Sequence, residues 1–280
     1  MKRALVTGCS SGIGLAVTQA LLADGWTVYG ASRTRPAIHS DEFVWAATDL
    51  LSDPLSVYAW QHTLAGLPLD ALVHCAGSQV PIGKVGDVHP GAWADCVTTN
   101  LVGVYRVLHA TLPALKRSQD GRILLFSGGG AFGPRPNYSA YAASKAGIVA
   151  LMESLAEELR GLSVTANCVA PGFVPTPIHR PTLAAGPDVV GVAEYDQIRR
   201  GLEHDDGSRT ARAVACVLHL LSDDTRGLTG KTISAEHDPW PSIRGMMVKM
   251  LNQSSAGTRT RSMQWPHTDA AYASAAGGRA

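Results

Sequence analysis

A tyrosine and a lysine four residues apart, Tyr141 and Lys145, form the pair in this 280-residue chain whose types and spacing most directly suggest chemistry. They fall within a helix-compatible run over residues 138–159, so we expect both side chains on one helical face. A lysine ammonium beside a phenol favours the phenolate, which lets the tyrosine act as an acid or base near neutral pH. The same spacing also occurs by chance as a surface pair on many helices, so this interpretation needs support from elsewhere in the chain.

That support comes from a glycine-rich turn near the start of the chain. After the apolar run 4–6, the sequence Thr-Gly-Cys-Ser-Ser-Gly-Ile-Gly over residues 7–14 leads into a helical pattern. The arrangement predicts a strand, a tight turn and a helix. Glycines at such a turn let backbone N–H groups approach a pyrophosphate, which the N-terminus of a helix also stabilises.

The glycine turn and the later Tyr-Ala-Ala-Ser-Lys together resemble the short-chain dehydrogenase/reductase family, over roughly residues 3–236. The resemblance implies a single Rossmann-like domain, a nicotinamide-dependent oxidoreductase activity on a carbonyl or secondary alcohol, and assembly as a homodimer or homotetramer. It implies that Tyr141 exchanges a proton with the substrate oxygen. Lys145 would support the phenolate and hold the nicotinamide ribose. Asn100 would complete a proton relay through a water bound at a slight distortion of its helix.

The resemblance also assigns a set of cofactor contacts that extends from the first turn to the loop after the sixth strand. Asp49 matches the position that contacts the adenine ring, and Thr176 matches the threonine that binds the carboxamide. The full set is Gly8, Ser10, Ser11, Gly12, Ile13, Gly14, Ser32, Arg33, Asp49, Leu50, Ala76, Gly77, Tyr141, Lys145, Pro171, Gly172 and Thr176.

The residues after the second expected strand, 27–31, bear on the choice of cofactor. In dinucleotide-binding folds an acidic residue here holds the ribose hydroxyl of NAD, whereas an arginine accommodates the 2′-phosphate of NADP. This chain has Ser32 and Arg33, with Arg35 nearby and no acid. We therefore expect NADP(H) in preference to NAD(H), although arginines that only solvate a loop are the alternative.

Two positions depart from the family pattern. Residues 74–77 are His-Cys-Ala-Gly where the family commonly has Asn-Asn-Ala-Gly, and we interpret His74 as a structural or cofactor-side residue. Gly128 stands thirteen residues before Tyr141, where the family usually has a serine that polarises the substrate carbonyl. Ser127 should point to the other side of the extended strand. A substitute donor could come from a nearby side chain, a backbone N–H of the glycine run, or the substrate. The residues expected around the substrate are therefore Gly128, Gly129, Asn137 and Ser139.

Strand-like and helix-like runs alternate along the chain, which predicts an α/β fold with a doubly wound, mostly parallel sheet of seven strands. The expected strands cover residues 4–6, 27–31, 43–47, 69–74, 122–126, 164–169 and 231–235. Helices are expected over residues 15–24, 54–64, 138–159 and 208–221, the last capped by Ser208, and residues 91–116 are expected to form one or two helices.

The domain organisation follows from these runs. Residues 1–238 are expected to form the dinucleotide-binding and catalytic domain, without a dividing linker. Within it, about residues 178–207 form an insertion after the sixth strand, where ligands bind in open α/β sheets, so we expect a substrate lid there. Residues 239–280 are an extension beyond the resemblance, and we expect disorder at its end.

Composition narrows the classes of partner. The net charge of +1, from 24 basic and 23 acidic residues, offers no basic field for nucleic acid or an anionic membrane. Five widely spaced cysteines suit reduced thiols, and none of the ten histidines falls into metal-ligand spacing. The chain shows no signal peptide and no apolar run of membrane-spanning length. We expect a soluble protein of the cytoplasm that binds a small molecule and no metal.

These features predict an NADP(H)-dependent oxidoreductase. The polar lid favours a small, sugar-like substrate, and 3-oxoacyl chains and steroid ketones remain open. The alternative from another class is an inactive, cofactor-sensing regulator or partner protein with the same fold, which Gly128 supports. The joint retention of Tyr141, Lys145, Asn100 and the glycine turn favours the enzyme, because a scaffold would not need them.

Overall fold

Seven parallel strands form one sheet in the order β3-β2-β1-β4-β5-β6-β7 in the computed structural model of the chain, which describes residues 1–242. The strands are β1 Arg3–Thr7, β2 Thr27–Ser32, β3 Phe43–Ala47, β4 Ala71–His74, β5 Gly121–Phe126, β6 Val164–Ala170 and β7 Thr232–Ser234. The prediction of a seven-stranded parallel sheet is confirmed. The strand order reverses between β1 and β4, and such a switch point opens a crevice at the carboxyl ends of the strands.

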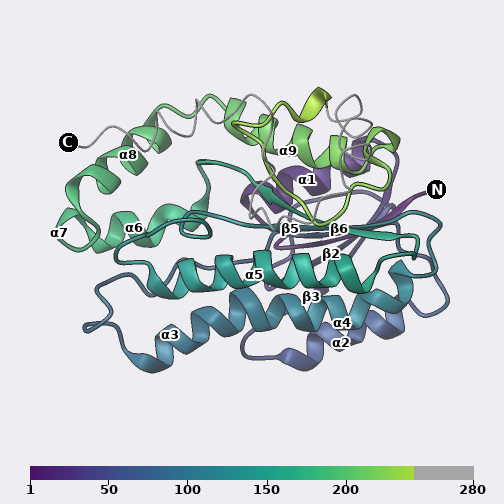
Figure 1. Cartoon of the computed structure of the whole chain (residues 1–280), viewed down its shortest axis with the longest axis horizontal. Coiled ribbons are helices and arrows are strands. Elements are labelled where there is room, and N and C mark those ends of the chain that lie inside the picture. The colour runs from purple at the N-terminus through teal and green to yellow at the C-terminus, as the bar shows by residue number, and fades with distance from the viewer. Residues whose placement is uncertain (243–280) are drawn as a thin grey trace, which may run out of the picture.

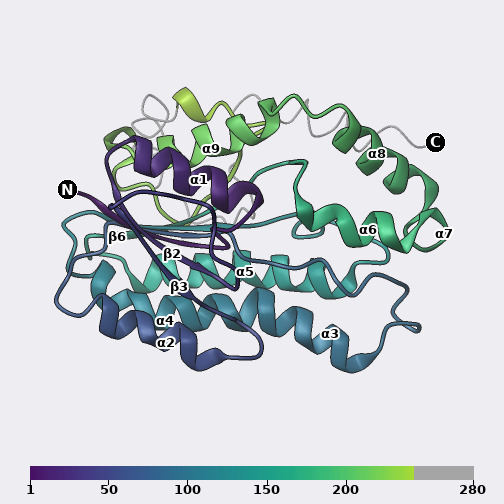
Figure 2. The ribbon, with the colours of Figure 1, turned by 180° about the vertical axis from the view of Figure 1, so that it is seen from behind.

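Helices cover both faces of the sheet, as Figures 1 and 2 show from opposite sides. One face carries α1 and α9, and the other carries α2, α4 and α5. The helices are α1 Gly12–Ala23, α2 Pro54–Thr63, α3 Pro90–Val97, α4 Gly103–Leu115, α5 Ser139–Glu158, α6 Arg180–Ala185, α7 Pro187–Val190, α8 Val192–Glu203 and α9 Ser208–Leu220. A π-helical turn, Thr98–Val102, joins α3 to α4, and short 3₁₀ turns span Pro177–His179, Asp223–Thr225 and Trp240–Ser242.

Two apolar clusters fill the space between the sheet and its helix layers. In β1, Leu5 belongs to the cluster under α2, α4 and α5, whereas Ala4 and Val6 belong to the cluster under α1 and α9. The split follows from the alternation of side chains along a strand. All six residues of β5 are buried, as expected for a central strand covered on both faces.

The starts of two helices test the predicted caps. Pro54 begins α2 as predicted, and the Asp53 carboxylate accepts a hydrogen bond from the Ser56 backbone N–H at 3.2 Å. The prediction that Ser208 caps α9 is wrong. Gly207 holds the cap position in a left-handed conformation with φ 77°, and the Ser208 hydroxyl instead bonds the carboxylate of Asp206.

The segment expected to form a lid is largely helical. The helices α6, α7 and α8 lie together beyond the carboxyl ends of the strands (Figures 1 and 2). Most of the expected C-terminal extension, with its predicted disordered end, lies outside the described residues. Trp240 is described, and its indole N–H donates to the Ala235 carbonyl at 3.1 Å. Within residues 1–242, no helix is both long and apolar enough to cross a membrane.

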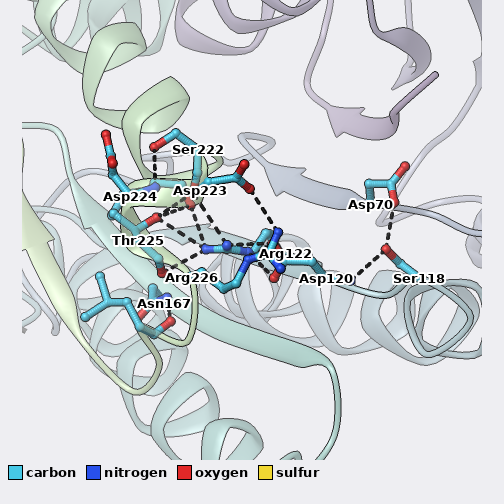
Figure 3. A network of polar contacts seen from close by, with 12 residues as sticks. Asp70, Ser118, Asp120, Arg122, Asn167, Ser222, Asp223, Asp224, Thr225 and Arg226 are labelled. Carbon is cyan, nitrogen blue, oxygen red and sulfur yellow. Dashed lines mark hydrogen bonds and ion pairs between the residues drawn. The ribbon is translucent and has the colours of Figure 1, made fainter. Parts of the chain in front are cut away.

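A buried arginine connects the start of β5 to the end of α9 (Figure 3). Arg122 forms two hydrogen bonds of 2.8 Å with the Asp120 carboxylate and donates to the Thr225 carbonyl at 2.9 Å. These bonds fix the amino end of the strand whose carboxyl end leads to Gly128.

Candidate active site

A cavity of about 1520 Å³ runs along the carboxyl ends of the strands, from the glycine turn after β1 to the lid helices α6 and α8. Every residue expected to contact the cofactor lines it. Gly128 and Gly129 line it as well. Asn137, Ser139 and Asn100 are not among its lining residues. The position agrees with the crevice expected at a switch point.

The glycine turn forms one end of the cavity by close packing of three loops. Gly8 has φ +68°, and a β-carbon added to it would lie 2.8 Å from the backbone nitrogen of Ala76. A β-carbon on Gly12, which has φ +54°, would lie 3.0 Å from the Thr176 side chain. Only glycine suits both positions, because other residues rarely adopt this φ and would also collide with their neighbours. The loops after β1, β4 and β6 thereby meet at the site expected for the pyrophosphate.

The end of β2 presents an arginine to the cavity. Arg33 is exposed and lines the cavity, whereas the hydroxyl of Ser32 is buried and accepts a hydrogen bond from the Trp45 indole N–H at 3.0 Å. The Ser52 hydroxyl and the backbone N–H groups of the same loop hold the pKa of Asp49 below its ordinary value, and Arg33 adds a smaller contribution. Arg33 is therefore the cation available to a phosphate here, and Ser32 supports the turn from inside.

Tyr141 and Lys145 lie together on the inner face of α5, as their spacing predicts. Both are largely buried, and the Lys145 ammonium lies 5.5 Å from the centroid of the Tyr141 ring. Lys145 donates a hydrogen bond of 2.8 Å to the carbonyl of Phe126, the last residue of β5. That bond anchors the ammonium between the end of β5 and the phenol.

Asn100 lies in the π-helical turn, and this turn is the helix distortion that the family resemblance implies. Its side chain pairs with the backbone of Ser78, accepting from the N–H at 2.8 Å and donating to the carbonyl at 2.7 Å. Ser78 lines the cavity in the loop after β4. Asn100 thus fixes the loop from behind, and its place in a proton relay stays a prediction.

His74 is buried in β4 at the edge of the same region. Neither of its ring nitrogens has a hydrogen-bond partner among residues 1–242. Burial lowers the pKa of His74 to about 3, with a smaller contribution from the charge of Lys145. The imidazole is therefore neutral near pH 7. Burial also raises the pKa of the neighbouring thiol of Cys75.

The surroundings of Gly128 show where the expected substitutes for a serine lie. A β-carbon on Gly128 would face the Tyr141 hydroxyl, whereas the Ser127 hydroxyl donates to the Val169 carbonyl at 3.4 Å. The Ser139 hydroxyl accepts from the Trp93 indole N–H at 3.1 Å. Asn137 forms a turn with φ 66°. The structure therefore does not bring Asn137 or Ser139 to the cavity wall, because a helix start and a turn engage them.

Sequence reasoning did not select Arg135 and Glu194, which line the substrate end of the cavity. They form an ion pair at 2.8 Å between the loop before α5 and the lid helix α8. Their side chains are 15% and 34% exposed. One sequence feature could have pointed to Arg135: it is an arginine five residues after a glycine run that lacks the expected serine hydroxyl.

The family model for short chain dehydrogenases matches residues 2–185 of this chain. The chain belongs to the short-chain dehydrogenase family. It is 32% identical over 241 residues to the 3-oxoacyl-[acyl-carrier-protein] reductase FabG of Salmonella typhimurium, which covers 83% of this chain and 94% of the relative. As a short-chain dehydrogenase, the protein is an oxidoreductase that acts on carbonyl or alcohol groups.

Solved structures of the family match the fold over most of its length. The aldohexose dehydrogenase of Thermoplasma acidophilum aligns with a TM-score of 0.71 and 25% identity, over 92% of this chain and 97% of that one. A short-chain dehydrogenase of Shigella flexneri, solved with NADP, aligns with a TM-score of 0.68 and 25% identity, over 84% of this chain and 97% of that one.

Proposed function

We propose that this short-chain dehydrogenase uses NADP(H) to interconvert a carbonyl and a secondary alcohol on a small, polar, sugar-like substrate. The observation that carries the proposal is the placement of Tyr141 and Lys145 in a cavity that continues from the glycine turn to a lid with polar side chains. A cofactor would occupy the first part and a substrate the second.

The chain's own residues account for binding and proton transfer. The glycine turn would hold a pyrophosphate, Arg33 would hold a 2′-phosphate, and the loop containing Thr176 would contact the nicotinamide end. The bound cofactor supplies or accepts the hydride. In the direction of reduction, Tyr141 donates its hydroxyl proton to the substrate oxygen. The Lys145 ammonium, held by the Phe126 carbonyl, then stabilises the phenolate that remains.

The preference for a polar substrate rests on the lining at the lid end. Hydrogen-bonding side chains from four separate segments line this end: Gln79, Asp95, Arg135, Glu194 and Gln197. Such groups suit a substrate with several hydroxyls, since an apolar ligand would cover them and leave them without hydrogen-bond partners. The similarity to an aldohexose dehydrogenase supports the same class.

A 3-oxoacyl chain is the second candidate, because aromatic and aliphatic side chains share the same wall. Phe132, Phe173, Ile178 and Ile198 line the cavity beside the polar group. The similarity to a 3-oxoacyl-[acyl-carrier-protein] reductase supports this class. A non-catalytic regulator is the remaining alternative, and it rests on Gly128 alone.

The Tyr141→Phe variant tests the enzymatic role. It removes the proton-donating hydroxyl and keeps the ring, so we expect kcat to fall by roughly 10²- to 10⁴-fold while the Kd for NADPH stays within about twofold. The assay is NADPH oxidation with D-xylulose, dihydroxyacetone, ethyl acetoacetate and androstenedione. Tyr58→Phe on α2, outside the cavity, is the matched control. Retention of more than about a tenth of the activity would refute the role of Tyr141. An unmutated protein that binds NADPH without oxidising it on any panel member would support the regulator.

The Arg33→Ala variant tests the choice of cofactor. We expect the unmutated protein to bind NADPH more tightly than NADH. In the variant, the difference between the two binding free energies should shrink by about 1.5–3 kcal/mol, the range for a charge-assisted hydrogen bond. Titration calorimetry with both cofactors measures the gap, and Arg160→Ala, at the far end of α5, is the control. Equal dissociation constants in the unmutated protein would contradict the preference.

We also infer a homodimer or homotetramer. Val102 and Tyr105 lie three residues apart where the π-helical turn passes into α4, and they are 38% and 55% exposed. Residues at this spacing share one helical face, so the helix presents an apolar surface that a second copy could cover. Light scattering of the full chain would give the mass, and a monomer at micromolar concentration would contradict the inference.

A further inference from the structure

Arg135 follows the glycine run after β5 and lies close to Tyr141, the proposed proton donor. Its guanidinium carbon lies 5.2 Å from the centroid of the Tyr141 ring and 4.1 Å from that of Tyr138. Its side chain is only 15% exposed and lines the same cavity as Tyr141. A cation held this close to the proton donor affects any negative charge that develops on the substrate oxygen.

Gly128 shapes this arrangement. A β-carbon on Gly128 would lie 2.5 Å from the Tyr141 hydroxyl oxygen, so a side chain there would collide with the phenol. A β-carbon on Gly129 would contact the Arg135 Cδ and Nη1 atoms at 3.4 Å. The bare backbone at 128 gives Tyr141 its place, whereas a β-carbon at 129 would make only ordinary van der Waals contact with Arg135, so Arg135 lies along the run without requiring a glycine there.

Glu194 holds the guanidinium from the lid. The Arg135 Nη2 group donates to the Glu194 carboxylate at 2.8 Å, while the aromatic ring of the buried Tyr138 supports the guanidinium from another side. A guanidinium has five N–H donors in a fixed fork. Within residues 1–242, the Nε and Nη1 donors of Arg135 have no hydrogen-bond acceptor. The cation is thus fixed in position and retains donors for a ligand.

We propose that Arg135 replaces the missing serine hydroxyl as the hydrogen-bond donor to the substrate oxygen that Tyr141 protonates. This rests on the proposed function. When hydride reaches the carbonyl carbon, the electron pair of the C=O bond moves onto oxygen, and Arg135 stabilises that charge until the Tyr141 proton arrives. Because Glu194 lies on α8, the packing of that helix sets the position of the donor. Arg135 would be a catalytic residue, and Glu194 a positioning residue.

The test measures steady-state kinetics of Arg135→Ala and Arg135→Lys with NADPH and the panel compound that the unmutated protein reduces fastest. Removal of one donor to a developing oxyanion typically costs about 10²- to 10³-fold in kcat. We expect that loss in Arg135→Ala, with a change in KM below about threefold and an unchanged Kd for NADPH. We expect Arg135→Lys to regain part of the rate. Arg199→Ala, on the outer face of α8, is the matched control and should keep normal activity.

Added guanidinium chloride at low millimolar concentration separates a chemical role from a structural one. We expect it to restore part of the rate of Arg135→Ala, with saturation, and to leave the control unchanged. A loss of kcat below about threefold, or a large loss that guanidinium does not reverse in a folded variant, would overturn the proposal. Folding is checked by thermal melting and by NADPH binding.

Tyr141→Phe, assayed in parallel, separates this proposal from the proposed function. If Tyr141→Phe is inactive and Arg135→Ala is not, only the role of Arg135 fails. If Tyr141→Phe remains active, or the unmutated protein reduces no panel compound, the proposed function fails and the role of Arg135 fails with it.

Discussion

Position 128 shows how one missing side chain changes the site around it. The space that a β-carbon at 128 would take is occupied by the Tyr141 hydroxyl, and the Tyr141 ring carbon beside that hydroxyl would be 3.2 Å away. The site is therefore packed around a glycine. Restoring the family's serine would add a hydroxyl but would also displace Tyr141, the proposed proton donor.

We therefore expect Gly128→Ser to lower kcat/KM, by at least about tenfold, because a general acid that moves away from the substrate oxygen loses much of its 10²- to 10⁴-fold contribution. Steady-state kinetics on the best panel compound measure the effect. Gly133→Ser in the same loop is the control, since a β-carbon on Gly133 would meet no atom within 4 Å. A gain in turnover from Gly128→Ser would show that the site is a degraded form of the family pattern, and would strengthen the regulator alternative.

His74 gives the fold a pH dependence. The pKa of His74 is about 3 in the fold and about 6.5 in the unfolded chain, so below about pH 6.5 the unfolded chain takes up a proton that the folded chain does not. Stability is therefore lost as the pH falls from about 6.5 towards 3, with a slope of at most about 1.4 kcal/mol per pH unit.

Between pH 7 and pH 5, we expect His74 to account for a loss of about 2 kcal/mol in the free energy of unfolding. Urea titrations at both pH values measure it, with His74→Asn as the variant and the exposed His39→Asn as the control. The His74→Asn protein should lose about 2 kcal/mol less than the unmutated protein over this interval. An identical loss in both would mean that His74 is protonated in the fold.

The residues that the sequence identified share one property. Tyr141, Lys145 and the glycine turn carry their signal within a few consecutive positions, and the structure places them in one cavity. Arg135 and Glu194 carry no such signal, because they are 59 residues apart and meet only through the packing of the lid. The turn around Arg135 has two prolines, which indicate a rigid connection. They do not indicate which way the arginine side chain points.

At the scale of elements, the sequence predicted the strands and long helices well. Buried strands are short apolar runs and most long helices have clear ends, so β3 and α2 begin where the sequence predicts. The lid was less predictable. Its glycines and prolines suggested loosened structure, but Gly186 and Gly191 lie between α6, α7 and α8 as breaks with φ 79° and 89°. Each short helix is stabilised by packing on its neighbours, which a local pattern does not contain.

The π-helical turn Thr98–Val102 illustrates a different limit. An asparagine within a helical run indicates some local requirement, because its side chain competes for backbone hydrogen bonds. The structure shows that the requirement is the backbone of Ser78, 22 residues away. The position of the distortion could be predicted from the residue, whereas its partner depends on how α3 packs against the loop after β4.

At the scale of the whole molecule, one sheet carries the glycine turn, the helix α5 with Tyr141 and Lys145, and the helices α6 to α8, so the strand ends must keep their relative positions. The interior strand β5 contacts α5 at one end and the turn after α9 at the other. Its last residue, Phe126, accepts the hydrogen bond from Lys145, and its second residue, Arg122, bonds to the turn after α9 (Figure 3). The Arg122 network lies at the amino end of the strand, the opposite end from the cavity.

Because of that separation, we expect Arg122→Met to reduce stability without altering the site. Arg122 is only 3% exposed, and its removal takes one donor from the Thr225 carbonyl and both 2.8 Å hydrogen bonds from the partly exposed Asp120 carboxylate. The Thr225 carbonyl keeps the Leu228 N–H and Asp120 keeps its longer contact with Arg226, so we expect the free energy of unfolding to fall by about 2 kcal/mol. Arg226→Ala is the matched control. It also pairs with Asp120, at 3.7 Å, but its side chain is 65% exposed, so its loss should change stability by less than about 1 kcal/mol.

Urea unfolding measures the stability of both variants, and NADPH titration of the folded variants should give unchanged dissociation constants. Equal effects of the two substitutions on the free energy of unfolding would show that the burial of Arg122 does not add to its stabilising effect. A weaker affinity for NADPH in Arg122→Met would show that the two ends of β5 are coupled.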